Sequence, residues 1–332
     1  MTGDMILLGL AGVIEAGAPI IIAAIGETLT ERAGLINLSL NGTIILSGMV
    51  GFWAALRTDS IILGFLAGML VGAIVAAIVA FSSITLKQSQ VAVGFVLAVM
   101  CKDLAYFLGN PIMGSQAPIL YATPIPILSE LPVIGALFFQ HSIMTYLSII
   151  LIFLSWFWVS KTRPGLKLRG IGEKPAAAYN RGTNVVGLRY LYTILGGALV
   201  GAAGPLYTLS VKAGWKGTIT GLDGIGWIVL ALTIFGGWEP IRVAFGAYLF
   251  AFLQWLGLVL QSTLTFIPSQ VLQVAPFPLM ILALLLVNLG NTEWVERFLA
   301  TLPETLRVRI KKLIRVTRSQ PPGALGVPFD RE

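Results

Sequence analysis

The chain consists of long apolar runs separated by short polar or glycine-rich breaks. A helix needs about 20 apolar residues to cross a bilayer, and several of these runs approach or exceed that length. The pattern predicts an all-α polytopic membrane protein with about nine transmembrane helices, within a range of about eight to ten. The predicted segments are 5–25, 35–56, 61–84, 91–109, 143–160, 189–211, 224–237, 243–261 and 271–289.

The segment 224–237 is the weakest of these, because about 14 residues are too few to cross the bilayer unaided. It is predicted to be a half-helix or a re-entrant element. Two glycine-rich polar stretches, 26–42 and 217–226, interrupt the apolar pattern, and each leads directly into a predicted segment.

In the orientation that the basic residues of the chain predict, the two stretches enter the membrane from opposite sides, one in each half of the chain. Such an arrangement is typical of transporters built from two inverted pseudo-repeats with broken helices. For each stretch alone, the alternative stays open that its glycines only let helices pack closely. The residues expected to contact a translocated solute here are Asn37, Ser39, Asn41, Thr220 and Asp223.

Composition supports membrane residence. Hydrophobic residues make up 56% of the 332 residues and charged residues 11%, whereas soluble domains carry about 25% charged residues. Cys101 is the only cysteine, which excludes an intrachain disulfide. His141 is the only histidine and is expected to be a solvated interface residue, so we expect no zinc or iron site.

Orientation follows from the 22 basic residues, of which seven lie in the loop 161–189 and eight in the tail 291–332. Because Lys and Arg beside membrane helices stay on the cytoplasmic side, both regions are predicted to be cytoplasmic. Counting segments backward places the N-terminus outside. The loop 110–142, with its five prolines, then falls on the outer side as an ordered or partly re-entrant cap.

The chain is therefore predicted to form one transmembrane domain over 1–290, followed by a basic cytoplasmic tail over 291–332. Between 306 and 318 of this tail, basic residues alternate with aliphatic ones. That pattern predicts an amphipathic helix bound to anionic membrane lipids, and nucleic-acid binding is not expected.

Few charged residues lie inside the predicted segments, and such a charge costs several kcal/mol unless it is paired or hydrated. Glu15 in the first segment is interpreted either as a solute-path residue or as a structural hydrogen-bonding group between helices. Lys102 and Asp103 are neighbours in the fourth segment and are expected to form a local pair that reaches toward the interface.

The loop 161–189 contains a short helix with recognisable boundaries. Pro175 can open it and Gly182 can close it. A compact helix of this kind is suited to docking into a groove of a partner. The chain has no G-x-x-x-x-G-K-[ST] motif and no catalytic constellation, so it is not expected to be an enzyme. Its energy must come from a partner or from an ion gradient.

Three blocks of residues resemble the permeases of bacterial ABC importers in the branched-chain amino acid, simple sugar and nucleoside group. The nucleoside type served by basic-membrane-protein lipoproteins is the most similar. The first block is Gly26-Glu27-Thr28 through Glu31-Arg32-Ala33-Gly34 with Asn37-Leu38. The second is Gly172-Glu173-Lys174-Pro175-Ala176-Ala177 with Gly182 and Asn184, followed by Gly196-Gly197-Ala198 and Gly201-Ala202-Ala203-Gly204. The third is Gly226-Trp227-Ile228 through Ile234-Phe235-Gly236-Gly237-Trp238 with Pro240.

The resemblance implies a permease in the bacterial plasma (inner) membrane that translocates a nucleoside-like or other small polar solute. It implies three kinds of partner: a cytoplasmic ABC ATPase that holds ATP and Mg, a second and often non-identical permease, and an extracytoplasmic solute-binding protein. No cofactor is implied in this chain. The residues implied to form the helix that couples to the ATPase are Gly172, Glu173, Lys174, Pro175, Ala176, Ala177 and Gly182.

The chain departs from the pattern of nucleoside-type relatives at two positions. Ser39 stands where these relatives usually have glycine, and Asn41 stands where they usually have an acid. Glu15 is likewise unexpected, so the solute can differ from an ordinary nucleoside. The alternative function is a secondary transporter driven by an ion gradient, which would also use broken helices and membrane carboxylates.

Overall fold

The computed structural model describes residues 3–263, 271, 278, 282 and 320–329. Every regular element within these residues is helical, which confirms the predicted all-α class for this part of the chain. The α-helices are α1 (Gly3–Arg32), α2 (Leu40–Thr58), α3 (Ile61–Ala80), α4 (Gln90–Gly109), α5 (Ile134–Phe138), α6 (Ile143–Lys161), α7 (Arg163–Glu173), α8 (Pro175–Asn180), α9 (Val185–Leu206), α10 (Ile225–Phe235) and α11 (Pro240–Thr263). The π-helical turns are η1 (Phe81–Thr85) and η4 (Tyr207–Val211), and the 3-10 turns are η2 (Asn110–Ile112), η3 (Leu128–Glu130) and η5 (Gly217–Thr220).

Seven helical segments of the described residues are long and apolar enough to cross a membrane. They contain α1, α3, α4, α6, α9, α10 and α11. Helix α2 has 19 residues but is not one of the seven; it carries Asn41, Thr43 and Ser47 in its first half and Arg57 in its last turn. The predicted ninth segment, 271–289, lies outside the described residues except at three positions. The count of nine and the inverted pseudo-repeats therefore stay predictions.

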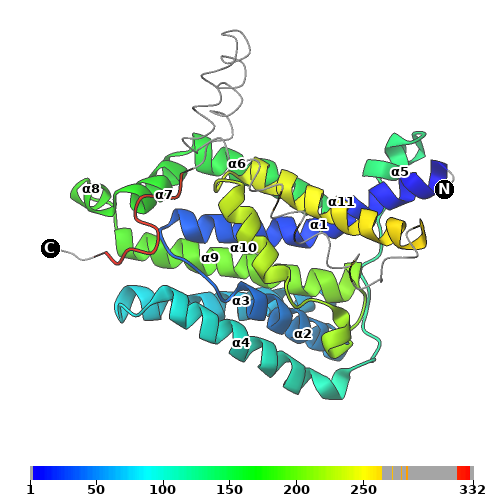
Figure 1. Cartoon of the computed structure of the whole chain (residues 1–332), viewed down its shortest axis with the longest axis horizontal. Helices are drawn as coiled ribbons and strands as arrows, with labels where there is room; N and C mark the ends of the chain where they lie inside the picture. Colours follow the sequence, from blue (N-terminus) through cyan, green and yellow to red (C-terminus); the bar gives the residue numbers. More distant parts are fainter. Residues whose placement is uncertain (1–2, 264–270, 272–277, 279–281, 283–319, 330–332) are drawn as a thin grey trace, which may run out of the picture.

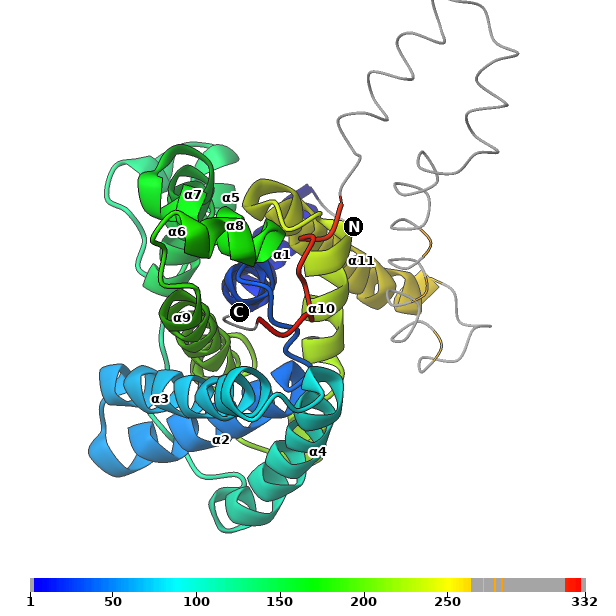
Figure 2. The same ribbon diagram turned by 90° about the vertical axis from the view of Figure 1, so that its left-hand side faces the viewer.

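Helix α1 runs along the long axis through the middle of the bundle (Figure 1). Viewed end-on, it is surrounded by the other helices (Figure 2) and packs against α6, α9, α10 and α11. Helix α9 in turn joins α1 to the layer formed by α2 and α3. The N-terminus and α5 lie at one end of the bundle, and α7, α8 and residues 320–329 lie at the other. We call these the outer and inner ends, after the predicted orientation.

The first two helices differ from their predicted bounds. Helix α1 does not end near residue 25 but continues through Arg32. The chain then turns at Gly34, whose φ is +94°, and residues 33–39 form an irregular loop. Helix α2 consequently begins at Leu40 rather than at position 35. The polar stretch 26–42 is therefore helical at both ends, with loop 33–39 between them.

Helices α3 and α9 touch through their backbones. A Cβ atom at Gly72 would overlap the carbonyl oxygen of Gly197, and one at Gly201 would overlap the carbonyl oxygen of Gly68. Only glycine at these positions permits this spacing, which brings the two helices into direct van der Waals contact.

The outer cap is ordered, as predicted. Thr123 N–H donates to the His141 carbonyl at 2.9 Å, and Leu120 N–H donates to the Leu209 carbonyl at 2.7 Å. The expectation for His141 was wrong, because its side chain is 2% exposed and its Nε2 lies 2.8 Å from the Leu137 carbonyl oxygen. The cap folds back over its own histidine and thereby removes it from water.

Candidate functional site

The two predicted breaks meet at the N-termini of α2 and α10. Asn41 Nδ2 donates to Asp223 Oδ1 at 2.7 Å, and Gly224 N–H donates to Asn41 Oδ1 at 2.8 Å. The amide of Asn41 is buried and thus uses both its donor and its acceptor across the contact. We call this contact the Asn41–Asp223 junction.

The backbones of α2 and α10 lie close together at the junction. A Cβ atom at Gly226 would overlap the backbone of Asn41, so α10 can approach α2 this closely only with glycine there. Both helices point their N-termini at this place, and a helix N-terminus carries a partial positive charge. The carboxylate of Asp223 lies where it offsets both of these charges.

Lys102 on α4 also contacts the Asn41–Asp223 junction. Its Nζ lies 3.6 Å from Asp223 Oδ2. The expected local pair of Lys102 with Asp103 is therefore wrong, because the cation reaches across to the loop before α10. The side chains of Lys102 and Asp223 are 30% and 50% exposed, so this ion pair lies at the side of the bundle rather than inside it.

One cavity lies toward the outer end of the bundle and another toward the inner end, and neither is lined by Asn41, Asp223 or Lys102. The outer one, about 610 Å³, is lined by the cap and by the loop after α9, including Ser115, Gln116 and Lys216. The inner one, about 430 Å³, is lined by Ile36 and Leu38 of loop 33–39 and by Leu230 of α10. Each volume is in the range of about 300–1,000 Å³ that small-molecule sites occupy.

Three of the predicted solute-contacting residues make hydrogen bonds within their own loops, and their contact with solute stays a prediction. Asn37 Oδ1 accepts from Ser39 N–H at 3.1 Å and from Ser39 Oγ at 2.6 Å, and both residues are buried. Thr220 Oγ1 accepts from Lys216 N–H at 2.8 Å. These contacts shape the two breaks that end at Asn41 and Asp223.

Glu15 lies away from these residues, in a separate cavity of about 410 Å³ between α1, η4 and α11. Ser210 Oγ donates to its Oε1 at 3.4 Å, and Gln254 lines the same cavity. This contact agrees with the structural alternative for Glu15, a hydrogen bond between elements, and leaves its possible contact with solute untested.

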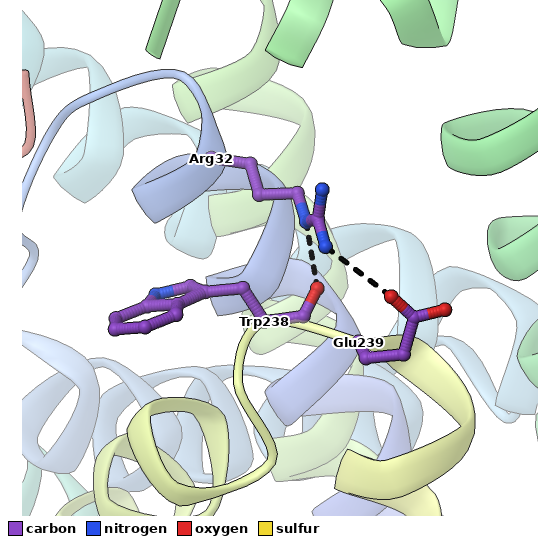
Figure 3. A network of polar contacts seen from close by, with 3 residues as sticks. All are labelled: Arg32, Trp238 and Glu239. Atoms are coloured by element: carbon purple, nitrogen blue, oxygen red, sulfur yellow. Dashed lines mark hydrogen bonds and ion pairs between the residues drawn. The ribbon is translucent and has the colours of Figure 1, made fainter. Parts of the chain in front are cut away.

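A second cluster of polar side chains lies at the inner end of α1. The sequence did not reveal it as a site. Trp238 Nε1 donates to the buried carboxylate of Glu31. Arg32 Nε donates to the Trp238 carbonyl at 2.7 Å, and its Nη2 lies 3.4 Å from Glu239 Oε2 (Figure 3). Together these contacts join α1 to the turn between α10 and α11.

Glu27, one helical turn before Glu31, is completely buried, and no described side chain donates a hydrogen bond to its carboxylate. Both acids were expected in an inner loop, and the error follows from ending the first helix too early. The available signal was the spacing of the two acids by four residues, which places them on one helical face. Within the described residues, no group of three His, Cys, Asp or Glu side chains gathers to hold a metal ion.

The short helix predicted between Pro175 and Gly182 is present, and its docking to a partner stays a prediction. α8 spans Pro175–Asn180, with Pro175 in its first turn and Gly182 at φ +78° just after it. Lys174, Ala176 and Ala177 are exposed at the inner end of the bundle. Gly172 differs from them, because it is buried against the Arg32 carbonyl, where a Cβ atom would not fit.

Residues 9–289 match the protein family described as branched-chain amino acid transport system / permease component. The chain is 33% identical to a Haloferax volcanii protein provisionally named as a glucose ABC transporter permease, over 96% of each chain. It is 32% identical to a nucleoside ABC transporter permease of Lactococcus lactis, over 83% of this chain and 91% of the relative. It is also 32% identical to a guanosine ABC transporter permease of Bacillus subtilis, over 80% of this chain and 88% of the relative. No solved structure matches the chain significantly.

Proposed function

We propose that this chain, which belongs to the family of branched-chain amino acid transport system permease components, imports a nucleoside-like or other small polar solute. It is the membrane subunit of an ABC transporter, as are its relatives named for nucleosides and sugars. The relatives' solutes share hydroxyl-rich, uncharged groups, which favours a solute of that chemistry here.

The half-exposed Lys102–Asp223 pair is the observation that carries the proposed path. Lys102 lies in the middle of α4, well away from either helix end. A charge at that depth facing lipid costs several kcal/mol, so this side of the bundle must face water or protein. We infer that solute passes along this side, next to the Asn41–Asp223 junction, from the outer cavity to the inner one.

A second permease completes this path in our proposal. The same helix α4 exposes apolar side chains, including Phe95, Val99 and Phe107, on which a partner helix can pack. A single chain leaves the Lys102–Asp223 pair open at one side. A partner that covers this side would enclose the ion pair in a water-filled path, as is typical for ionisable residues in membrane proteins.

The remaining partners are proposed from the two ends of the bundle. A cytoplasmic ABC ATPase, which supplies ATP and Mg, would dock on the exposed face of α8. A solute-binding protein would deliver solute to the outer cap. The proposed location is the bacterial plasma membrane, with the N-terminus outside and the C-terminal tail in the cytoplasm. The predicted amphipathic helix of this tail lies outside the described residues.

Reconstituted uptake tests the function. Proteoliposomes containing this chain, its ATPase and the second permease, supplied with binding protein, should accumulate labelled guanosine or glucose only when ATP is present. Uptake by this chain alone along an ion gradient would establish the secondary-transporter alternative and contradict the proposal.

The docking site is tested separately with Ala177→Trp on the exposed face of α8. This bulky side chain should prevent the ATPase from co-purifying with the permease and should abolish uptake. The matched control is Ala122→Trp, at an exposed position of the outer cap. Normal ATPase association in Ala177→Trp would show that α8 is not the docking site.

A further inference from the structure

The C-terminal residues 320–329, which we call the strap, lie across the inner end of α1, between α8 and α10 (Figure 2). Ala324 N–H donates to the Gly172 carbonyl at 2.8 Å, and Gly326 N–H donates to the Gly34 carbonyl at 3.0 Å. One backbone segment is thus bonded on one side to the end of α7 and on the other side to loop 33–39.

Side chains add three more anchors to the strap. Gly323 N–H donates to Glu173 Oε2 at 3.0 Å, and buried Arg189 donates to the Val327 carbonyl at 3.0 Å. The ring of Phe329 lies against that of Tyr179 on α8, with centroids 5.7 Å apart. The strap is thus tied to α7, α8, α9 and loop 33–39.

The turn of the strap fits closely against loop 33–39. Gly326 has φ +75°, a conformation that glycine adopts at no steric cost. A Cβ atom there would also lie 2.9 Å from the Ile36 side chain. Pro321 and Leu325 of the strap form a wall of the inner cavity, together with Ile36. A displacement of the strap would therefore change the shape of this cavity.

Loop 33–39 continues the connection to the junction. It runs from Gly34, which is bonded to the strap, to α2, whose second residue is Asn41. The loop is stiffened by the hydrogen bonds of Asn37 to Ser39. The part of the loop next to Asn41 is thus held by its own hydrogen bonds, which favours transmission of a displacement at Gly34 to Asn41.

We propose that the strap is a mechanical link that transmits the movement of α8 to the Asn41–Asp223 junction. The proposal rests on the proposed docking of the ATPase at α8. When the ATPase moves α8, the Phe329–Tyr179 and Gly323–Glu173 contacts move the strap, and the Gly326–Gly34 bond moves the loop before α2. Hydrolysis and opening of the inner cavity are coupled through these contacts.

The test uses the complete importer in proteoliposomes and measures solute uptake and ATP hydrolysis together. Phe329→Ala and a chain truncated after Ser319 should keep the ATPase bound but lower the uptake per ATP hydrolysed by about fivefold or more. Pro328→Ala, at an exposed strap position, is the matched control and should leave this ratio unchanged. An unchanged ratio in both strap variants would overturn the proposal and leave the strap as a passive brace.

A crosslink provides a second measurement that does not remove the strap. In a Cys101→Ala background, Tyr179→Cys and Phe329→Cys would be joined by a short bis-maleimide in the assembled importer. Because this double variant lacks both rings, it should couple as poorly as Phe329→Ala before linking, and linking should restore the uptake per ATP hydrolysed. No recovery on linking would contradict the proposal. If Ala177→Trp leaves the ATPase bound, the docking proposal fails instead, whatever the strap variants do.

Discussion

The side-chain amide of Asn41 donates a 2.7 Å hydrogen bond to the carboxylate of Asp223, although the two residues are 182 positions apart. This contact joins the two breaks in the helical pattern. It also gives the amide at position 41 a role, because an acid there would face the Asp223 carboxylate and would lose the donor.

Exchanging the two groups tests this relationship. Asn41→Asp removes the donor and places two carboxylates together, so uptake should fall at least about tenfold. A hydrogen bond to a charged group is worth about 1.5–3 kcal/mol. The double variant Asn41→Asp/Asp223→Asn restores a donor–acceptor pair and should recover part of the uptake. Equal loss in the single and double variants would show that the pair does not act as a unit.

Neutralising Lys102 tests the proposed solute path. Lys102→Met removes the ion pair with Asp223 and should lower ATP-driven uptake several-fold. Because a half-exposed ion pair contributes less than about 1 kcal/mol, the free energy of unfolding should hardly change. Lys102→Arg should retain most of the uptake, and Lys161→Met at the exposed end of α6 should have no effect.

The indole of Trp238 is predicted to stabilise the fold. Trp238→Phe leaves the buried Glu31 carboxylate without this donor, which should cost about 1–3 kcal/mol of unfolding free energy. The control is Trp215→Phe, because Trp215 is equally buried but its Nε1 has no hydrogen-bond partner within the described residues. Unfolding can be followed with a thiol-reactive dye, since the only cysteine, Cys101, is buried. Similar Tm losses in both variants would contradict a specific role for the Glu31–Trp238 bond.

The contact between α3 and α9 can be tested with a single methyl group. Gly72→Ala places a Cβ atom on the Gly197 carbonyl and should destabilise the bundle by about 1–3 kcal/mol. Gly12→Ala, where no atom lies within 4 Å of the new Cβ, should be neutral or slightly stabilising. The same dye assay gives both values, and equal Tm values for the two variants would contradict the close packing.

Labelling of introduced cysteines checks the orientation. In a Cys101→Ala background, a membrane-impermeant maleimide should label Ala122→Cys on intact cells, because the outer cap faces outward. Ala176→Cys on α8 should react only after the membrane is opened. The reverse labelling pattern would show that the proposed topology is wrong and that the chain lies in the opposite orientation.

The structural features that could be predicted depend on residues that are close together in the sequence. Long apolar runs, Pro175 and Gly182 were enough to predict the membrane helices and the short helix α8, because hydrophobic length and helix boundaries depend on neighbouring residues. The two polar breaks were visible for the same reason. The end of α1 was misplaced because Glu27 and Glu31 look like loop residues until their burial against α9, α10 and loop 33–39 is known.

The sequence alone therefore determined that the chain is a bundle of membrane helices, where its helices break, and which short helix is exposed at one end. Only the tertiary structure decided which polar groups meet. Asn41 and Asp223, Lys102 and Asp223, Glu31 and Trp238, and the strap with Gly34 are all distant in sequence. A partner stabilises a polar side chain in a membrane helix, but which residue becomes that partner depends on how the helices pack around α1.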